Sequence, residues 1–566
     1  MDTLDHIQQL LVDIYGETLG KKAWLRIAPL IEKAPQQAPR RDGFFSEEDV
    51  VLITYGDSIT QAGQAPLQTL HTFARDYLQD VFSTIHFLPF FPWSSDDGFS
   101  VKDFMAIDPQ LGNWGHVSRI GRDFDLMFDY VVNHVSAQSQ WFQDYLAAKP
   151  GFEALAIEMD PSADISTVTR PRALPLLSEF TKLSGEPVQV WTTFSDDQID
   201  LNYRSLDVLV KMLEALLLYV ANGARLIRMD AIAYLWKEIG TTCIHLPQTH
   251  LMVKLFRAVF DSVAPDTVII TETNVPHAEN ISYFGNGRDE AQMVYNFTLP
   301  PLLLHAFVQG DATALSQWAR GLKLNSPDTT FFNFTASHDG IGVRPLEGIL
   351  PPEAVDTTLA ESVLQNGGQI SYKNNPDGSQ SPYELNITYV DALAVPGRPD
   401  APLHPARFLA SQSIQYALPG VPATYIHSLL GSRNWFAGLA QTGRARTINR
   451  EKLELDAVVA ALQSPDSFRT RIFVPYAHMI RIRRQQPAFH PNADFDILDL
   501  GPRVFGIKRT APSQTIWAVT NITDKPASID LTGSGANGPL HDLISATTIN
   551  LSTLKLGPYA FMWLST

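Results

Sequence analysis

A group of acidic, basic and imidazole side chains stands at or near the ends of apolar segments, and these residue types could do chemistry together. They occur in "FDYVVNH" (128–134), "RLIRMD" (225–230), "ITETN" (270–274) and "FTASHD" (334–339), and are Asp129, Asn133, His134, Arg228, Asp230, Glu272, His338 and Asp339. Paired carboxylates with imidazoles and a cation are suited to proton transfer and to nucleophilic attack at a sugar carbon. These segments are therefore candidates for one catalytic site.

Arg228 and Asp230 give the first chemical clue. They are two positions apart in an apolar segment, so a strand would place both side chains on one face, and burying an ion pair seldom adds stability. The cation is expected to lower the pKa of Asp230 and keep it ionised as a nucleophile. Glu272, in a dry position on the neighbouring strand, is expected to hold a proton for the leaving oxygen. Asp339 and His338 would then bind sugar hydroxyls in a retaining glycosyl transfer.

Each of these residues also has a structural interpretation. Arg228 and Asp230 could form a structural ion pair, His134 could cap a turn, and Glu272 could cap a helix. Their occurrence at four strand ends favours a shared site instead. A metal site is disfavoured because the chain has no HExxH motif, and a serine nucleophile because it has no GxSxG motif.

The elements that must position these residues alternate regularly along the chain. Apolar runs typical of strands alternate with segments of helical period, and the runs are 49–57, 84–92, 124–134, 224–233, 267–274, 292–297, 330–339 and 423–428. This alternation predicts an α/β fold, a (β/α)8 barrel of parallel strands with outer helices. In such a barrel the active site lies at the carboxyl ends of the strands.

Several regions do not follow the alternation of strands and helices that predicts the barrel. We expect an N-terminal helical extension (1–45), a barrel (46–134 and 204–489), an insert domain after the third strand (135–203), a second insert after the seventh (340–402) and a C-terminal antiparallel β-domain (490–566). Both inserts follow strands, so both are expected to border the active site.

Composition narrows the functional classes. The chain has 566 residues, is 45% hydrophobic and carries a net charge of −17 without a basic stripe, which disfavours nucleic acid as a partner. A lone cysteine, Cys243, excludes an intrachain disulfide. The N-terminal segment reads as an amphipathic helix and not as a signal peptide, and no apolar stretch is long enough to span a bilayer. We therefore expect a cytoplasmic protein with no membrane partner, and leave open whether it forms a homo-oligomer.

The four motifs together resemble the conserved regions of the α-amylase superfamily, glycoside hydrolase family 13, in order and spacing. The resemblance extends from about residue 50 to the end of the chain. It implies a retaining double displacement with Asp230 as nucleophile, Glu272 as general acid/base and Asp339 as transition-state stabiliser. Arg228, His134 and His338 would assist at the glucose subsite.

Further segments resemble the sucrose phosphorylase branch of that superfamily, among them "LPFFPWSSDDGFS", "RPRALPLL", "SHDGIGV" and "TINR". The resemblance implies that Asp96 and Arg450 bind glucose hydroxyls and that Phe99 forms an apolar platform. It also implies that inorganic phosphate accepts the glucosyl group, with no metal and no cofactor, and that Arg172 and Tyr383 contact the phosphate.

The acceptor side departs from the sucrose phosphorylase pattern. Glu384 follows Tyr383, where that pattern has a glutamine, and the helical N-terminal extension is additional. Both features resemble the glucosylglycerate phosphorylases, a sister group, and imply α-glucosylglycerate and phosphate as small-molecule substrates. A glycerate carboxylate needs a cation, for which the candidates on nearby loops are Arg170, Arg172, Arg344, Lys373 and Arg433. Sucrose phosphorylase, sucrose 6-phosphate phosphorylase, α-glucosidase or sucrose hydrolase, and a catalytically inactive binding subunit remain alternatives.

Overall fold

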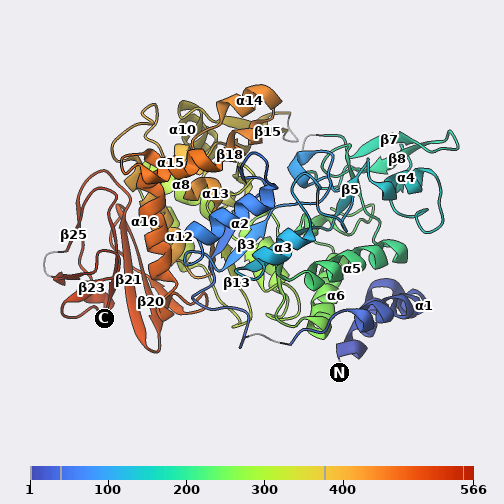
Figure 1. Cartoon of the computed structure of the whole chain (residues 1–566), viewed down its shortest axis with the longest axis horizontal. Coiled ribbons are helices and arrows are strands. Elements are labelled where there is room, and N and C mark those ends of the chain that lie inside the picture. Colours follow the sequence, from blue (N-terminus) through green and yellow to red (C-terminus); the bar gives the residue numbers. More distant parts are fainter. Residues whose placement is uncertain (1–2, 39–40, 172–173, 375–377, 552–553) are drawn as a thin grey trace.

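The computed structural model describes residues 3–38, 41–171, 174–374, 378–551 and 554–566 (Figure 1). Eight parallel strands close into a barrel in the order β1-β17-β13-β12-β11-β10-β4-β3. They are β1 (Val51–Thr54), β3 (Thr84–Phe87), β4 (Asp125–Val131), β10 (Ala224–Asp230), β11 (Val268–Thr271), β12 (Met293–Tyr295), β13 (Thr330–Asn333) and β17 (Val421–Tyr425). The predicted (β/α)8 fold is confirmed.

The strands are shorter than the apolar runs that predicted them. The run at 84–92 leaves the strand after Phe87, and the run at 330–339 leaves it after Asn333. The last strand begins at Val421, before the predicted run at 423–428, and helix α13 (Ile426–Leu429) follows it directly. The remaining apolar residues of these runs are still buried, since they line the loops at the mouth of the barrel.

The helices that surround the barrel bury an apolar face. In α5 (Leu206–Ala221), the buried residues Leu209, Leu213 and Leu216 recur at helical spacing. Four of the helices carry a proline in the first turn, where its missing N–H costs no helical hydrogen bond, and they are α2 (Pro66–Tyr77), α6 (Pro247–Val263), α8 (Leu299–Gln309) and α12 (His404–Ala417). The other outer helices are α3 (Trp114–Ile120), α9 (Thr313–Arg320), α14 (Phe436–Thr442), α15 (Leu455–Gln463) and α16 (Phe468–Arg483).

Two insertions rise from the carboxyl ends of β4 and β13. The first contains β5 (His134–Ser136), α4 (Gln140–Leu146), β6 (Glu158–Met159), β7 (Leu177–Thr181), β8 (Pro187–Trp191) and β9 (Gln198–Asp200). The second contains β14 (Ile341–Gly342), α10 (Ala360–Gln365), β15 (Gln369–Asn374), β16 (Gln380–Asn386) and α11 (Tyr389–Ala392). In the second insertion β16 lies between β14 and β15 in a small antiparallel sheet, which carries its side chains to the barrel mouth.

An N-terminal helix, α1 (Thr3–Lys33), packs on α5 and α6 and is visible beside them in Figure 1. It is kinked at Gly16, where φ is 79°. The two halves approach closely at Gly20, where a Cβ atom would lie 2.7 Å from the carbonyl oxygen of Leu11. Arg26 of this helix donates a 2.7 Å hydrogen bond to Asp207 at the start of α5. Contacts from both halves thus attach α1 to the outside of the barrel.

The C-terminal region forms a six-stranded antiparallel sheet in the order β19-β20-β21-β26-β23-β24, at the opposite end of the molecule from α1 (Figure 1). Its strands are β19 (Asp494–Ile497), β20 (Val504–Ala511), β21 (Gln514–Asn521), β23 (Leu540–Asp542), β24 (Thr547–Ile549) and β26 (Phe561–Ser565), with β22 (Ala527–Ser528) and β25 (Lys555–Leu556) paired beside them. The predicted C-terminal β-region is confirmed. Across the described ranges, every helix is too short or too polar to span a bilayer.

Candidate active site

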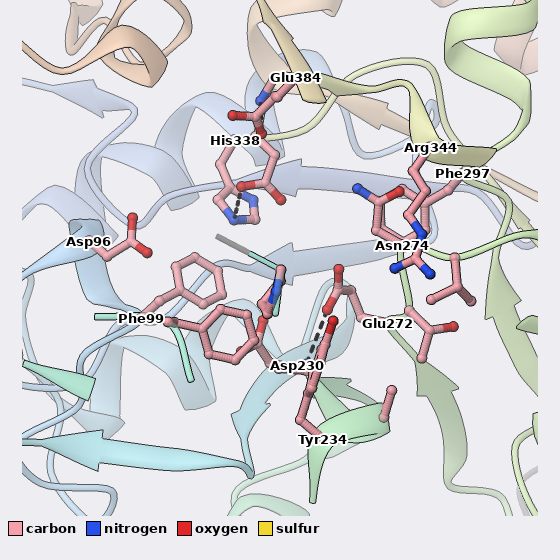
Figure 2. A pocket seen from close by; sticks show the side chains of 18 of the residues that line it. Asp96, Phe99, Asp230, Tyr234, Glu272, Asn274, Phe297, His338, Arg344 and Glu384 are labelled. Carbon is pink, nitrogen blue, oxygen red and sulfur yellow. Dashed lines mark hydrogen bonds and ion pairs between the residues drawn. The ribbon is translucent and has the colours of Figure 1, made fainter. Parts of the chain in front are cut away.

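A pocket opens at the carboxyl ends of the barrel strands, between the two insertions (Figure 2). Most residues predicted from the sequence line it, namely Asp96, Phe99, His134, Arg228, Asp230, Glu272, His338, Asp339, Arg344, Tyr383 and Glu384. Lys373 and Arg450 line an adjoining hollow instead, which shares Asp96, Tyr383 and Glu384 with the pocket. Arg172 lies outside the described residues. The structure therefore brings together residues from five barrel strands or the loops that follow them.

Arg228 is the centre of the charged network at the base of the pocket. Its Nη1 lies 2.9 Å from Oδ1 of Asp230 and also contacts Asp129 on the adjacent strand, and its Nη2 lies 4.0 Å from Oε2 of Glu272. Asp129 is fixed from its other side by His86, at 3.0 Å. Because β4, β10 and β11 are neighbours in the barrel, three carboxylates reach one guanidinium.

Glu272 is oriented by the backbone as well as by Arg228. Its Oε2 accepts a hydrogen bond of 3.0 Å from the backbone N–H of Ala231, the residue directly after Asp230. Figure 2 shows Asp230 and Glu272 directed into the same part of the pocket. A pair of carboxyls that face the same space is the set of groups on which glycosyl transfer depends.

The pKa values of the Asp230 and Glu272 carboxyls are both raised, whereas the sequence predicted a lowered pKa for Asp230. Burial raises the pKa of Asp230 well above its ordinary value, and the opposing effect of Arg228 does not cancel it. Burial likewise raises the pKa of Glu272. The expectation that Arg228 would leave the pKa of Asp230 lowered was wrong, because it considered the cation without the desolvation and without the nearby acids. The shorter contact of Arg228 with Asp230 still favours the negative charge there and the proton on Glu272.

Asp339 and His338 lie on the opposite wall, after β13. His338 Nε2 is 3.3 Å from Oδ1 of Asp339, and burial lowers the pKa of His338 to about 3, so the imidazole is neutral. Burial alone would raise the pKa of Asp339, but the neighbouring cations, led by Arg446, hold it well below its usual range. Arg446 Nη1 lies 2.6 Å from Oδ1 of Asp339. Asp339 is therefore an anion in the unliganded protein.

An aromatic wall lies beside these polar groups. The ring of Phe99 stacks on His338, with ring centroids 4.5 Å apart and an interplanar angle of 9°. The backbone oxygen of Phe99 also bonds to Nε2 of His134 at 2.8 Å, and burial lowers the pKa of His134 to about 4. Arg450 is held behind this wall, since it contacts Asp97 and donates a 2.8 Å hydrogen bond to the backbone oxygen of His338.

The residues predicted for the acceptor side differ in whether their side chains already have partners within the protein. Glu384 is already engaged, because it accepts hydrogen bonds of 3.1 and 2.8 Å from Arg446. Lys373 pairs with Glu347 at 3.2 Å and faces the adjoining hollow. Arg344 is a half-buried cation on the pocket wall, and among the described residues its guanidinium has no ion pair or hydrogen bond. In Figure 2 its side chain extends toward the space above Glu272.

The sequence reasoning missed a second buried network behind His134. Nζ of Lys237 lies 2.6 Å from Oδ2 of Asp200 and 2.7 Å from Oδ1 of Asn133, and the Lys237 and Asp200 side chains are 3% and 0% exposed. This ammonium joins the first insertion, through Asp200, to the end of β4. Within the described ranges, no cluster of three or more His, Cys, Asp or Glu side chains could hold a metal ion. Neither Lys237 nor Arg446 is marked in the sequence by hydrophobic periodicity or by a place at the end of a predicted strand.

Comparison with known proteins agrees with this geometry. Residues 74–339 match the family described as alpha amylase, catalytic domain. The chain is 51% identical to a glucosylglycerate phosphorylase of Allomeiothermus silvanus over 93% of this chain and 95% of the relative, and 45% identical to one of Escherichia coli over 99% of each. The solved structure of a sucrose 6F-phosphate phosphorylase from Thermoanaerobacter thermosaccharolyticum is similar with a TM-score of 0.73 and 27% identity, covering 84% of this chain and 94% of that one.

The barrel and its carboxylate site define the class of protein, and the extent of these similarities defines the group within it. The chain belongs to the α-amylase family, glycoside hydrolase family 13, and within that family to the phosphorylase branch that these relatives represent.

Proposed function

We propose that the chain is a retaining glucosylglycerate phosphorylase, which converts α-glucosylglycerate and phosphate to α-glucose 1-phosphate and D-glycerate. The observation that carries this proposal is the 45–51% identity to proteins of that name over nearly the whole chain. The contact of Arg228 with both Asp230 and Glu272 supports the chemistry. A cytoplasmic location remains a prediction from the sequence, and the oligomeric state stays open.

The proposed reaction proceeds in two displacements. Asp230 attacks the anomeric carbon while Glu272 gives its proton to the glycosidic oxygen, so glycerate leaves and a β-glucosyl ester of Asp230 forms. An oxygen of phosphate then attacks the same carbon, Glu272 takes the phosphate proton, and the ester bond to Asp230 breaks. Asp339 is an anion placed to bind the sugar as positive charge develops on the ring.

Arg344 supports a negatively charged acceptor. It is a cation on the pocket wall without a protein partner among the described residues, and a carboxylate bound to arginine forms charge-assisted hydrogen bonds. Tyr383, on β16, lines the same pocket and is the proposed phosphate contact.

Direct assay tests the proposal. Purified protein is incubated with α-glucosylglycerate, sucrose or sucrose 6-phosphate, each with and without phosphate, and α-glucose 1-phosphate and free glucose are measured. We expect phosphate-dependent α-glucose 1-phosphate with α-glucosylglycerate as the preferred substrate. Release of free glucose that is independent of phosphate would contradict a phosphorylase, and a preference for sucrose would contradict the acceptor.

A further inference from the structure

Arg446 connects two acidic residues that belong to different parts of the pocket. It lies in a short 3-10 helix (Ala445–Asn449), after the last barrel strand. Its Nη1 is 2.6 Å from Oδ1 of Asp339, and its Nε and Nη2 donate to the two oxygens of Glu384 at 3.1 and 2.8 Å. One planar guanidinium thus bridges the site on β13 and the hairpin of the second insertion.

Glu384 is itself held firmly in this arrangement. Glu384 is 6% exposed, and it lies in β16, the central strand of the small sheet between β14 and β15. Its Oε1 also accepts a 3.1 Å hydrogen bond from the backbone N–H of Gly340, the residue after Asp339. A Cβ atom at Gly340 would lie 2.6 Å from Cγ of Glu384, so only glycine allows this approach. Glu384 therefore fixes both Arg446 and the backbone beside Asp339.

The contact of Arg446 with Asp339 matters because other charged groups surround Asp339. The charged and titratable groups that lie near enough to interact electrostatically with it include Arg446, His338, Arg450, Arg228, Asp230, Glu272, Tyr55, Tyr295 and Tyr425. Two of these are carboxyls that would repel a second anion at close range. Arg446 is the cation with the largest effect on Asp339, and it makes a direct contact. Without it, Asp339 would keep its 3.3 Å contact with His338 but would be held less firmly and would more readily take up a proton.

We propose that Arg446 is a positioning residue, which holds the Asp339 carboxylate ionised and aimed at the glucose subsite, and that Glu384 serves to hold Arg446 and not to bind the acceptor directly. This inference rests on the proposed function for its assay. It also revises the sequence prediction that Glu384 contacts the acceptor, because both of its oxygens are engaged within the protein.

The test compares Arg446→Gln and Arg446→Lys with the unmodified protein in the phosphorolysis assay, over a range of pH. We expect kcat to fall by about 100-fold in Arg446→Gln, with a smaller change in KM for phosphate. The acid limb of the kcat profile, to which the ionisation of Asp230 also contributes, should steepen and move to higher pH, because loss of the cation raises the pKa of Asp339. Arg446→Lys keeps the charge and should restore the acid limb and part of kcat. A merely structural arginine would not move the acid limb.

Two further variants complete the test. Glu384→Gln should lower kcat by about 10-fold through loss of the ionic contact, while the acid limb stays in place because Arg446 still faces Asp339. Arg320→Gln is the matched control, since Arg320 is an exposed arginine at the end of α9 and lines neither the pocket nor the adjoining hollow. Thermal unfolding of each variant monitors folding, and Arg446→Lys remains informative if Arg446→Gln does not fold.

The outcomes separate this inference from the proposed function. An unchanged acid limb and kcat in folded Arg446→Gln would overturn the positioning role, and so would a defect confined to KM for phosphate or glycerate, which would make Arg446 an acceptor ligand. Should the unmodified protein prefer another α-glucoside, the proposed acceptor is wrong. The same comparison then proceeds on that substrate, because Asp339 acts on the glucosyl group that all of them share.

Discussion

The guanidinium of Arg228 lies 2.9 Å from the carboxylate of Asp230, two residues along the same buried strand. The same cation also contacts Asp129, which His86 holds from behind. Because Arg228 is shared, it does not fully offset the burial of Asp230, whose pKa remains raised. We propose that the pair serves catalysis and not stability, because burial of an ion pair seldom adds stability.

Replacement of Asp230 tests its role as nucleophile. Asp230→Ala should lower kcat for phosphorolysis by at least about 1,000-fold, because no covalent ester can form. Asp42→Asn is a matched control, since Asp42 is an exposed acid in the segment before β1 and does not line the pocket, and its kcat should be unchanged. Mass spectrometry of protein quenched with substrate should show an added glucosyl group in the unmodified chain and none in Asp230→Ala. Near-normal turnover by that variant would exclude the double displacement.

Lys237 is expected to matter for stability. Lys237→Met leaves the Asp200 carboxylate buried without its cation, which should cost about 3–5 kcal/mol in the free energy of unfolding. Denaturant unfolding measures this loss, and Lys323→Met, at an exposed lysine, should change the value by less than about 0.5 kcal/mol. The double variant Lys237→Met with Asp200→Asn should recover part of the loss, because the unpaired charge is removed. A loss equal to that of the exposed control would mean that the buried pair contributes no net stability.

The sequence predicted the barrel and its main carboxylates for a local reason. Apolar runs mark strands, and polar residues at their ends, such as Asp230 and Glu272, must meet at the barrel mouth once the strands are parallel. The contacts of Arg446 with Asp339, and of Lys237 with Asp200, join residues that are distant in the chain and have no periodic signal. The direction of the Asp230 pKa shift also required the structure, because desolvation depends on everything packed around the carboxyl.

Arg344 is expected to select acceptors by charge. In the synthetic direction, with α-glucose 1-phosphate as donor, Arg344→Gln should lower kcat/KM for glycerate by about 10- to 100-fold, the range of one lost charge-assisted hydrogen bond. Glycerol has no carboxylate, so its kcat/KM with the same donor should fall much less. Arg320→Gln, at an exposed arginine on an outer helix, is the control for a general loss of positive charge. Equal losses for glycerate and glycerol would assign Arg344 to the donor phosphate instead.

Glu272 sets the alkaline limit of activity if it is the general acid. It must be protonated to assist the leaving glycerate oxygen, so activity is present below its pKa in the folded protein and is lost as the pH rises through that value. Burial raises this pKa, and therefore the alkaline limb of kcat/KM should lie above the usual range of a glutamate. α-Glucosyl fluoride provides the control, because fluoride leaves without a proton. With that donor the limb should flatten, and Glu272→Gln should retain far more activity than with α-glucosylglycerate. An alkaline limb that is the same for both donors would show that another group, and not Glu272, protonates the leaving oxygen.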